Sequence, residues 1–175
     1  MDYRVKSATV EQTREWGKQL GARLRGGDVV ALSGDLGAGK TAFAQGVGES
    51  LGVKGSMTSP TFTFQQEYIG RILNSGMGIE TQTETEIRLI HMDLYRLQRP
   101  EEVEVIGVED AFVEDAVCLI EWPEIAEDLL PESRLDIQII GSGEAPREII
   151  FRAREHDWEL RLKDLNILGE VRRIQ

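Results

Sequence analysis

The eight residues GDLGAGKT, Gly34–Thr41, decide how this chain is expected to fold. Before them stands DVVALSG (28–34), a short apolar run rich in β-branched residues, which is typical of a buried parallel strand. After them, KTAFAQGVGESLG (40–52) reads as a helix that stops at Gly52. The eight residues satisfy the pattern G-x-x-x-x-G-K-[ST], and a strand before it and a helix after it are the context that a phosphate-binding loop requires.

The composition of this loop suits a phosphate chain. Glycines let the backbone wrap around the phosphates, and backbone N–H groups at the start of the following helix form an anion site. Lys40 could reach the β- and γ-phosphates, and the hydroxyl of Thr41 could bind Mg²⁺. A chance match to the pattern is expected in under about one such chain in a hundred, given average glycine usage. We therefore predict a nucleotide site.

Two later apolar runs end in a carboxylate. IRLIHMD (87–93) ends in Asp93, and VCLIE (117–121) ends in Glu121, which Trp122 follows. In folds with this kind of loop, a strand next to the loop strand ends in an acid that faces Mg²⁺. Either carboxylate could bind the ion, directly or through water, and the other could orient an attacking water. The alternative for each is that it merely caps a strand end.

The rest of the chain alternates between helical and extended patterns. We expect a first helix that begins at a capping box at Thr9 and ends at Gly26 and Gly27. An edge strand at 61–69, a helix at 100–112 and an antiparallel pair of strands at 134–141 and 147–155 should follow. The composition of residues 70–86 predicts a mobile loop or hairpin tip. Residues 157–175 are expected to form a helix or strand followed by a tail. The whole predicts one α/β domain over residues 1–175, in three layers, with a mostly parallel central sheet and antiparallel strands at its edges.

The charge of the chain restricts its partners. It has 31 acidic and 20 basic residues, for a formal net charge of −11. That balance disfavours unaided binding to DNA or RNA, whose phosphates need lysine and arginine contacts. No apolar run is long enough to cross a bilayer, and the first residues lack the apolar stretch of a secretion signal. The single cysteine, Cys118, excludes an internal disulfide, so a cytoplasmic location is expected.

The nucleotide is expected to be ATP. An N-K-x-D-like run for guanine is absent, and Asp93 is followed by LYR rather than by x-x-G, which disfavours a GTPase. A small-molecule kinase remains an alternative, because kinases of about this size share the loop. Such kinases usually close an arginine-rich lid over the phosphates. The stretch 70–86 holds only Arg71, which favours an ATPase that acts with partners.

Five segments, in order, carry a resemblance to a known family. SGDLGAGKT, SPTFTF, HMDLYRL, GVEDAF and LIEWPE together resemble the TsaE (YjeE) family of P-loop ATPases, and the likeness extends to about Arg154. That family is required for the threonylcarbamoyladenosine modification of the tRNA adenosine beside the anticodon. The resemblance implies a P-loop NTPase-like fold, slow ATP hydrolysis with Mg²⁺, and TsaB-like and TsaD-like protein partners. It implies that tRNA is met only through the complex, in which TsaE drives turnover and does not itself transfer the carbamoyl group.

The resemblance also assigns roles to residues. The residues that would hold the phosphates are Leu36, Gly37, Ala38, Gly39, Lys40 and Thr41. Thr41 and Glu121 match the family's Mg²⁺ ligands, and Asp93 matches its catalytic aspartate. Thr61 matches a switch-like threonine, and Trp122 matches a tryptophan next to the nucleotide.

Looser matches place the adenosine side of the nucleotide near Thr9 or Val10 and near Arg147. The chain departs from the family at residues 70–86, which form a longer link than usual and therefore bear on the partner surface, not on the nucleotide site. His91, two residues before Asp93, could help to position water or could be a packed, hydrogen-bonded histidine.

Phe62 and Phe64 stand at period two, which indicates core residues more than stacking partners for a ligand.

Overall fold

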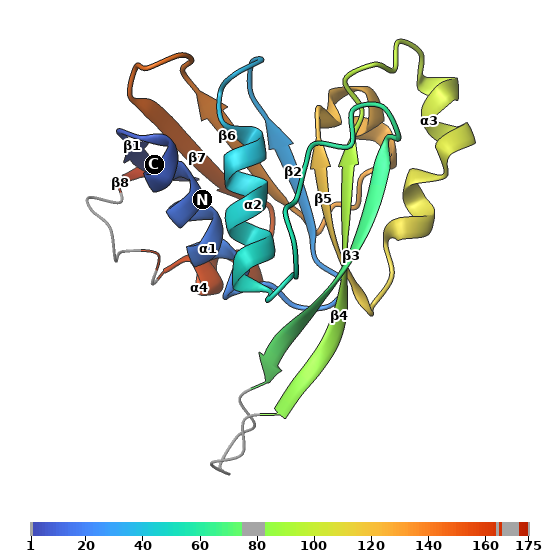
Figure 1. The fold of residues 1–175 in the computed structure, drawn as a ribbon, viewed down its shortest axis with the longest axis horizontal. Helices are drawn as coiled ribbons and strands as arrows, with labels where there is room; N and C mark the ends of the chain where they lie inside the picture. The colour runs from blue at the N-terminus through green and yellow to red at the C-terminus, as the bar shows by residue number, and fades with distance from the viewer. Residues whose placement is uncertain (1, 75–82, 164, 166–171, 175) are drawn as a thin grey trace.

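The computed structural model describes residues 2–74, 83–163, 165 and 172–174. These residues form one mixed sheet with the strand order β3-β4-β5-β2-β6-β7-β1-β8 (Figure 1). The strands are β1 (Asp2–Ser7), β2 (Val29–Ser33), β3 (Gln65–Asn74), β4 (Thr83–Asp93), β5 (Ala116–Glu121), β6 (Leu135–Ile140), β7 (Arg147–Ala153) and β8 (Arg172–Ile174). The helices are α1 (Val10–Gly21), α2 (Lys40–Ser50), α3 (Pro100–Ile106) and α4 (His156–Leu162), with 3₁₀ turns η1 (Val108–Ala111) and η2 (Pro123–Leu129).

The centre of the sheet is parallel. β2 pairs in parallel with β5 on one side and β6 on the other, and β5 pairs in parallel with β4. The strands outside this centre are antiparallel: β3 against β4, β7 against β6, and β1 between β7 and β8. The expected mostly parallel centre with antiparallel edges is therefore confirmed.

Helices cover both faces of this centre, which makes three layers (Figure 1). Alternate residues of β2 divide between two cores, because side chains along a strand point to opposite faces. Val30 and Leu32 pack in the core under α1, α2 and α4, which also contains Trp16, Phe43 and Trp158. Val29 and Ala31 pack in the core under α3, η1 and η2.

The two helices on the larger core, α1 and α2, touch backbone to backbone. A Cβ atom built on Gly17 would lie 2.1 Å from the carbonyl oxygen of Phe43, and one built on Gly46 would lie 1.9 Å from that of Arg14. Both distances are far shorter than any real Cβ contact, so glycine is required at these two positions. This contact fixes the start of α2, and with it the glycine-rich turn, against α1.

Several boundaries differ from expectation. Residues 61–64 form a turn, and β3 starts only at Gln65, so the edge strand predicted at 61–69 begins four residues late. Phe64 has a φ of 61°, which is not an extended conformation, so the strand cannot include this residue. Phe62 is 78% exposed, so its prediction as a core residue is wrong. Residues 70–86 were expected to form a mobile loop or hairpin tip; residues 70–74 and 83–86 belong to the paired strands of the β3–β4 hairpin, and residues 75–82 lie outside the described part of the chain.

The helix predicted at 100–112 is interrupted. α3 ends at Ile106 because Gly107 takes a left-handed conformation, with a φ of 72°, and the 3₁₀ turn η1 follows. β1 was not predicted at all. Its Tyr3, Val5 and Ser7 are buried while the residues between them are not, which is the alternation of a half-buried strand. A helix or strand plus a tail was expected from Asp157 onward, and the structure has the helix α4 there, which begins one residue earlier at His156.

Candidate nucleotide-binding site

The glycine-rich turn joins β2 to α2 at the edge where the parallel strands end. Gly34 has a φ of 146°, and a Cβ atom there would lie 2.5 Å from the carbonyl oxygen of Ile139. Gly39, the residue that precedes α2, has a φ of 109°, a conformation that side chains rarely adopt. Among the described residues no side chain caps this helix start. Its first N–H groups are therefore available to an anion.

Lys40 is the first residue of α2 and is almost fully buried, with 6% of its surface exposed. Its Nζ donates to the carbonyl oxygens of Gly34 (2.5 Å) and Asp35 (3.0 Å) and lies 4.1 Å from the ring centroid of Trp122. Burial lowers the pKa of Lys40 below its ordinary value of 10.5, and the nearby carboxylate of Glu121 opposes that shift. A phosphate chain would supply the negative charge that would offset this burial.

The two predicted acids lie next to each other. Glu121 of β5 is in register with Leu32 of β2 on one side and with Asp93 of β4 on the other. The carboxylate of Asp93 is held by three donors: its Oδ2 accepts from the hydroxyls of Ser59 (2.6 Å) and Thr61 (2.9 Å), and its Oδ1 accepts from the backbone N–H of Tyr95 (2.9 Å). These donors fix the orientation of the Asp93 carboxylate. Asp93 is also almost fully buried, with 3% of its surface exposed.

Glu121 has a different neighbour. Its Oε1 lies 2.8 Å from Nε2 of His91, and both side chains are buried. Trp122 follows it with a φ of 56°, an unusual conformation for an aromatic residue. That turn brings the indole over Lys40 and against Tyr95, with 4.8 Å between the two ring centroids.

Arg147, at the start of β7, binds backbone carbonyl oxygens of the glycine-rich turn. Its Nε donates to the carbonyl oxygen of Ala38 (2.6 Å), and its Nη2 donates to those of Gly143 (2.9 Å) and, at a longer 3.4 Å, Gly37. Because the C=O and N–H of one peptide unit point in opposite directions, a carbonyl of Ala38 turned toward Arg147 turns the N–H of Gly39 the other way. Arg147 is 6% exposed.

These groups surround one pocket of about 430 Å³. It is lined by Val10, Leu36, Gly37, Gly39, Lys40, Thr41, Ser59, Thr61, Asp93, Tyr95, Glu121, Trp122 and Arg147. Of the residues predicted from the sequence, Ala38 and Thr9 do not line it. Ala38 is buried in the core. Thr9 instead caps α1, where its Oγ1 accepts from the backbone N–H of Gln12, while its neighbour Val10 reaches the pocket.

Sequence reasoning did not assign a role to Ser59 or Tyr95. Both stood inside the motifs SPTFTF and HMDLYRL, so their positions gave a signal. Their roles depend on the turn at 61–64 and on the contact with Trp122. Neither feature could be read from sequence spacing.

The oxygens in this pocket suit Mg²⁺. Thr41 and Glu121 both line it and offer a hydroxyl and a carboxylate oxygen, the hard ligands that this ion prefers. Over the described residues, no group of three or more His, Cys, Asp or Glu side chains could hold a metal ion by itself. Mg²⁺ in proteins usually relies on one or two protein oxygens together with substrate phosphates and water, so two ligands are sufficient.

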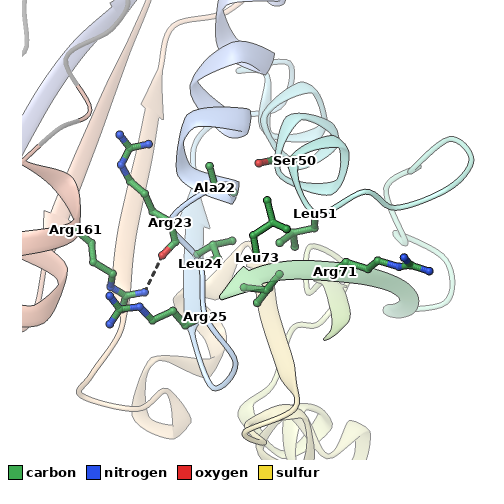
Figure 2. Close-up of a pocket in the computed structure, with 11 residues that line it drawn as sticks. Ala22, Arg23, Leu24, Arg25, Ser50, Leu51, Arg71, Leu73 and Arg161 are labelled. Carbon is green, nitrogen blue, oxygen red and sulfur yellow. Dashed lines mark hydrogen bonds between the residues drawn. The ribbon is translucent and has the colours of Figure 1, made fainter. Parts of the chain in front are cut away.

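A larger cavity, of about 750 Å³, lies at the C-terminal ends of α1 and α2 (Figure 2). Four arginines line it: Arg23, Arg25, Arg71 and Arg161. They do not converge on a common point, since Figure 2 shows Arg71 directed away from Arg25 and Arg161. Arg71 pairs with Glu84 (2.7 Å), and Arg161 donates to the carbonyl oxygen of Arg23 (3.1 Å). This cavity therefore lacks the convergent groups of the smaller pocket.

Within the described residues, no helix has the length and apolar character needed to cross a membrane.

Comparison with known proteins shows the family of the chain. The family model of the threonylcarbamoyl adenosine biosynthesis protein TsaE matches residues 7–149. The TsaE protein of Bacillus subtilis is 37% identical over 161 residues, which cover 92% of each chain, and that of Treponema pallidum is 36% identical over 146 residues, covering 83% of this chain and 97% of the other. The crystal structure of Bacillus subtilis YdiB superimposes with a TM-score of 0.70 at 34% identity, over 94% of each chain. The chain belongs to the TsaE family of tRNA threonylcarbamoyladenosine biosynthesis proteins.

Proposed function

We propose that this protein binds and slowly hydrolyses ATP with Mg²⁺ in the synthesis of threonylcarbamoyladenosine on tRNA. In this proposal it drives turnover of TsaB-like and TsaD-like partners and does not transfer the carbamoyl group itself. The observation that carries the proposal is the meeting of Lys40, Thr41, Asp93 and Glu121 in one pocket beside the uncapped start of α2.

Each group has a task in this proposal. The N–H groups at the start of α2 and the ammonium of Lys40 hold the phosphates, for which Lys40 leaves the carbonyl oxygens of Gly34 and Asp35. Thr41 and Glu121 hold Mg²⁺, which neutralises charge on the phosphates when it is bound. Asp93, already fixed by three donors, orients the attacking water. Trp122 borders the phosphate side through its contact with Lys40.

Slow hydrolysis by the isolated chain follows from the shortage of positive charge at the site. Of the described residues, Lys40 and Arg147 are the cations that line the pocket, and the guanidinium of Arg147 already binds backbone carbonyl oxygens. Stabilising the transition state of phosphoryl transfer by an additional arginine is worth about 10³–10⁵ in rate where it occurs. A partner that completes the site would therefore accelerate turnover.

The acidity of the chain supports an indirect route to tRNA. A net charge of −11 repels the phosphate backbone, so the partners would contribute most of the contacts to tRNA. We expect weak or no binding of tRNA by the isolated protein at physiological salt. Tight, salt-sensitive binding without partners would make tRNA a direct ligand and contradict this part of the proposal.

The decisive experiment measures phosphate release from ATP by the protein alone and then with purified TsaB-like and TsaD-like proteins. We expect slow release alone, acceleration with partners, and preference for ATP over GTP in competition. Lys40→Ala removes the positioned cation and should abolish nucleotide binding in calorimetry. Unchanged ATP binding by this variant would refute the nucleotide site, and phosphate transfer to a small acceptor in place of release would favour the kinase alternative.

A further inference from the structure

One buried polar group near the pocket has no role in the scheme above. His91 of β4 is 0% exposed and does not line the pocket. Its Nε2 contacts Oε1 of Glu121 at 2.8 Å, whereas its Nδ1 has no hydrogen-bond partner among the described residues. A carboxylate can only accept, so Nε2 carries a hydrogen, and Nδ1 is left buried without a partner among the described residues.

The unsatisfied nitrogen costs stability. Leaving a buried donor or acceptor without a partner costs on the order of 1–3 kcal/mol, and an apolar side chain in this place would avoid that cost. The remaining contact of the imidazole, to Glu121, is therefore the interaction that distinguishes histidine from an apolar residue here. Because His91 reaches the pocket through Glu121, its effect on the site must act through that carboxylate.

Strand geometry shows what this contact does. In the β4–β5 pairing, Asp93 lies beside Glu121 and His91 lies two residues back, beside Leu119, on the same face of the sheet. His91 therefore engages Oε1, and Oε2, which has no hydrogen bond among the described residues, is the oxygen left for a ligand in the pocket that Thr41 also lines. The described structure contains no ion pair between Lys40 and Glu121 within 4.0 Å, although the two charges interact, so the hydrogen bond to His91 is the direct contact that the Glu121 carboxylate makes.

We infer that His91 is a positioning residue that orients the Glu121 carboxylate toward the Mg²⁺ position and keeps it from neutralising Lys40. This inference rests on the proposed Mg²⁺-ATP site. Outer partners that orient a metal-binding carboxylate typically change metal affinity by about 10–100-fold when they are removed. Without His91, Glu121 is expected to turn toward the ammonium of Lys40, so that Mg²⁺ loses a ligand and the phosphates lose part of their cation.

The test is calorimetric titration of ATP with and without Mg²⁺, in the wild type, in three variants of His91 and in one control variant. His91→Leu removes the donor, and His91→Phe removes it while filling the space of the imidazole. His91→Gln keeps an N–H donor close to the position of Nε2. His156, which is exposed and contacts Glu159 at 3.4 Å, provides the matched control as His156→Leu. Melting curves of each variant report folding independently of Mg²⁺.

In the wild type, Mg²⁺ should tighten ATP binding. His91→Leu or His91→Phe should lose about 10–100-fold of that gain, His91→Gln should recover part of it, and His156→Leu should retain all of it. A purely structural role would lower the melting temperature and leave the gain from Mg²⁺ intact, which would overturn the inference. If His91→Leu is unfolded, the folded His91→Phe decides in the same way. A wild type that gains nothing from Mg²⁺ would instead overturn the proposed function, and the inference with it.

Discussion

Replacing Arg147 by methionine should lower the stability of the protein and weaken its proposed ATP site. The guanidinium makes two short hydrogen bonds, to the carbonyl oxygens of Ala38 (2.6 Å) and Gly143 (2.9 Å), and both are lost in Arg147→Met. Hydrogen bonds to a charged donor contribute about 1.5–3 kcal/mol each, so the variant should lose roughly 3–6 kcal/mol of unfolding free energy. That is a large share of the roughly 5–15 kcal/mol that stabilises a typical domain.

The site should change for a separate reason. Without Arg147 the carbonyl of Ala38 has no fixed donor, so the peptide unit before Gly39 can rotate and its N–H no longer points reliably toward the position proposed for the phosphates. ATP affinity should therefore fall even under conditions in which the variant is fully folded. Reduced affinity at a temperature well below the melting transition would separate this effect from instability.

Urea unfolding and ATP titration measure the two effects. At about 2–4 °C per kcal/mol for a domain of this size, the melting temperature should fall by roughly 6–24 °C. The matched control is Arg152→Met on the same strand, where the side chain is 41% exposed, its Nη2 donates to Oε1 of Gln138 at 2.8 Å and its ion pair to Asp2 spans 3.4 Å. A surface pair of that kind contributes less than about 1 kcal/mol. Equal losses in the two variants, or unchanged ATP binding by Arg147→Met, would refute the reasoning.

Three further predictions follow from the same geometry. In urea unfolding, Gly46→Ala should lose about 1–3 kcal/mol or more of unfolding free energy, because its Cβ would meet the backbone of α1. Gly48→Ala meets only the flexible side chain of Met57 and should lose less. Equal losses would contradict the backbone contact. Burial lowers the pKa of Lys40, so just below pH 10.5 the folded protein binds fewer protons than the unfolded chain. The unfolding free energy of the ligand-free wild type, compared with that of Lys40→Met, should therefore rise as the pH approaches 10.5. Parallel pH profiles of the two proteins would disprove this. Glu121→Gln should fold normally but hydrolyse ATP much more slowly, with the turnover number falling more than the Michaelis constant rises; wild-type turnover would remove Glu121 from the site.

The parts of the site that could be predicted from the sequence are those set by local rules. Gly34 and Gly39 need positive φ angles within one short turn, and a strand before the turn and a helix after it make the pattern recognisable. Asp93 and Glu121 each end a buried run, and parallel strands bring such ends to one edge of the sheet. These arguments use neighbours along the chain or a general property of sheets.

The remaining parts depend on contacts that the sequence does not encode locally. Arg147 meets Ala38 across 109 positions of the chain, and nothing in its own surroundings indicates that its partners are backbone carbonyls. The left-handed backbone of Trp122 contradicts the preference of a bulky aromatic residue, so no propensity could predict it. β1 had a readable alternation, but it is only six residues long and its polar positions resemble those of a terminal tail.

The position of β1 has a consequence for how the chain is completed during translation. Asp2–Ser7 pairs on one side with β7 and on the other with β8, both from the last third of the chain. β1 therefore leaves the ribosome well before either of its partners, while β2, α2 and β5, which are made in between, can already associate. A nascent chain in this interval carries an unpaired strand edge, which is a template for pairing with another chain. Ribosome-bound intermediates should accordingly be prone to association until residues 147–153 emerge.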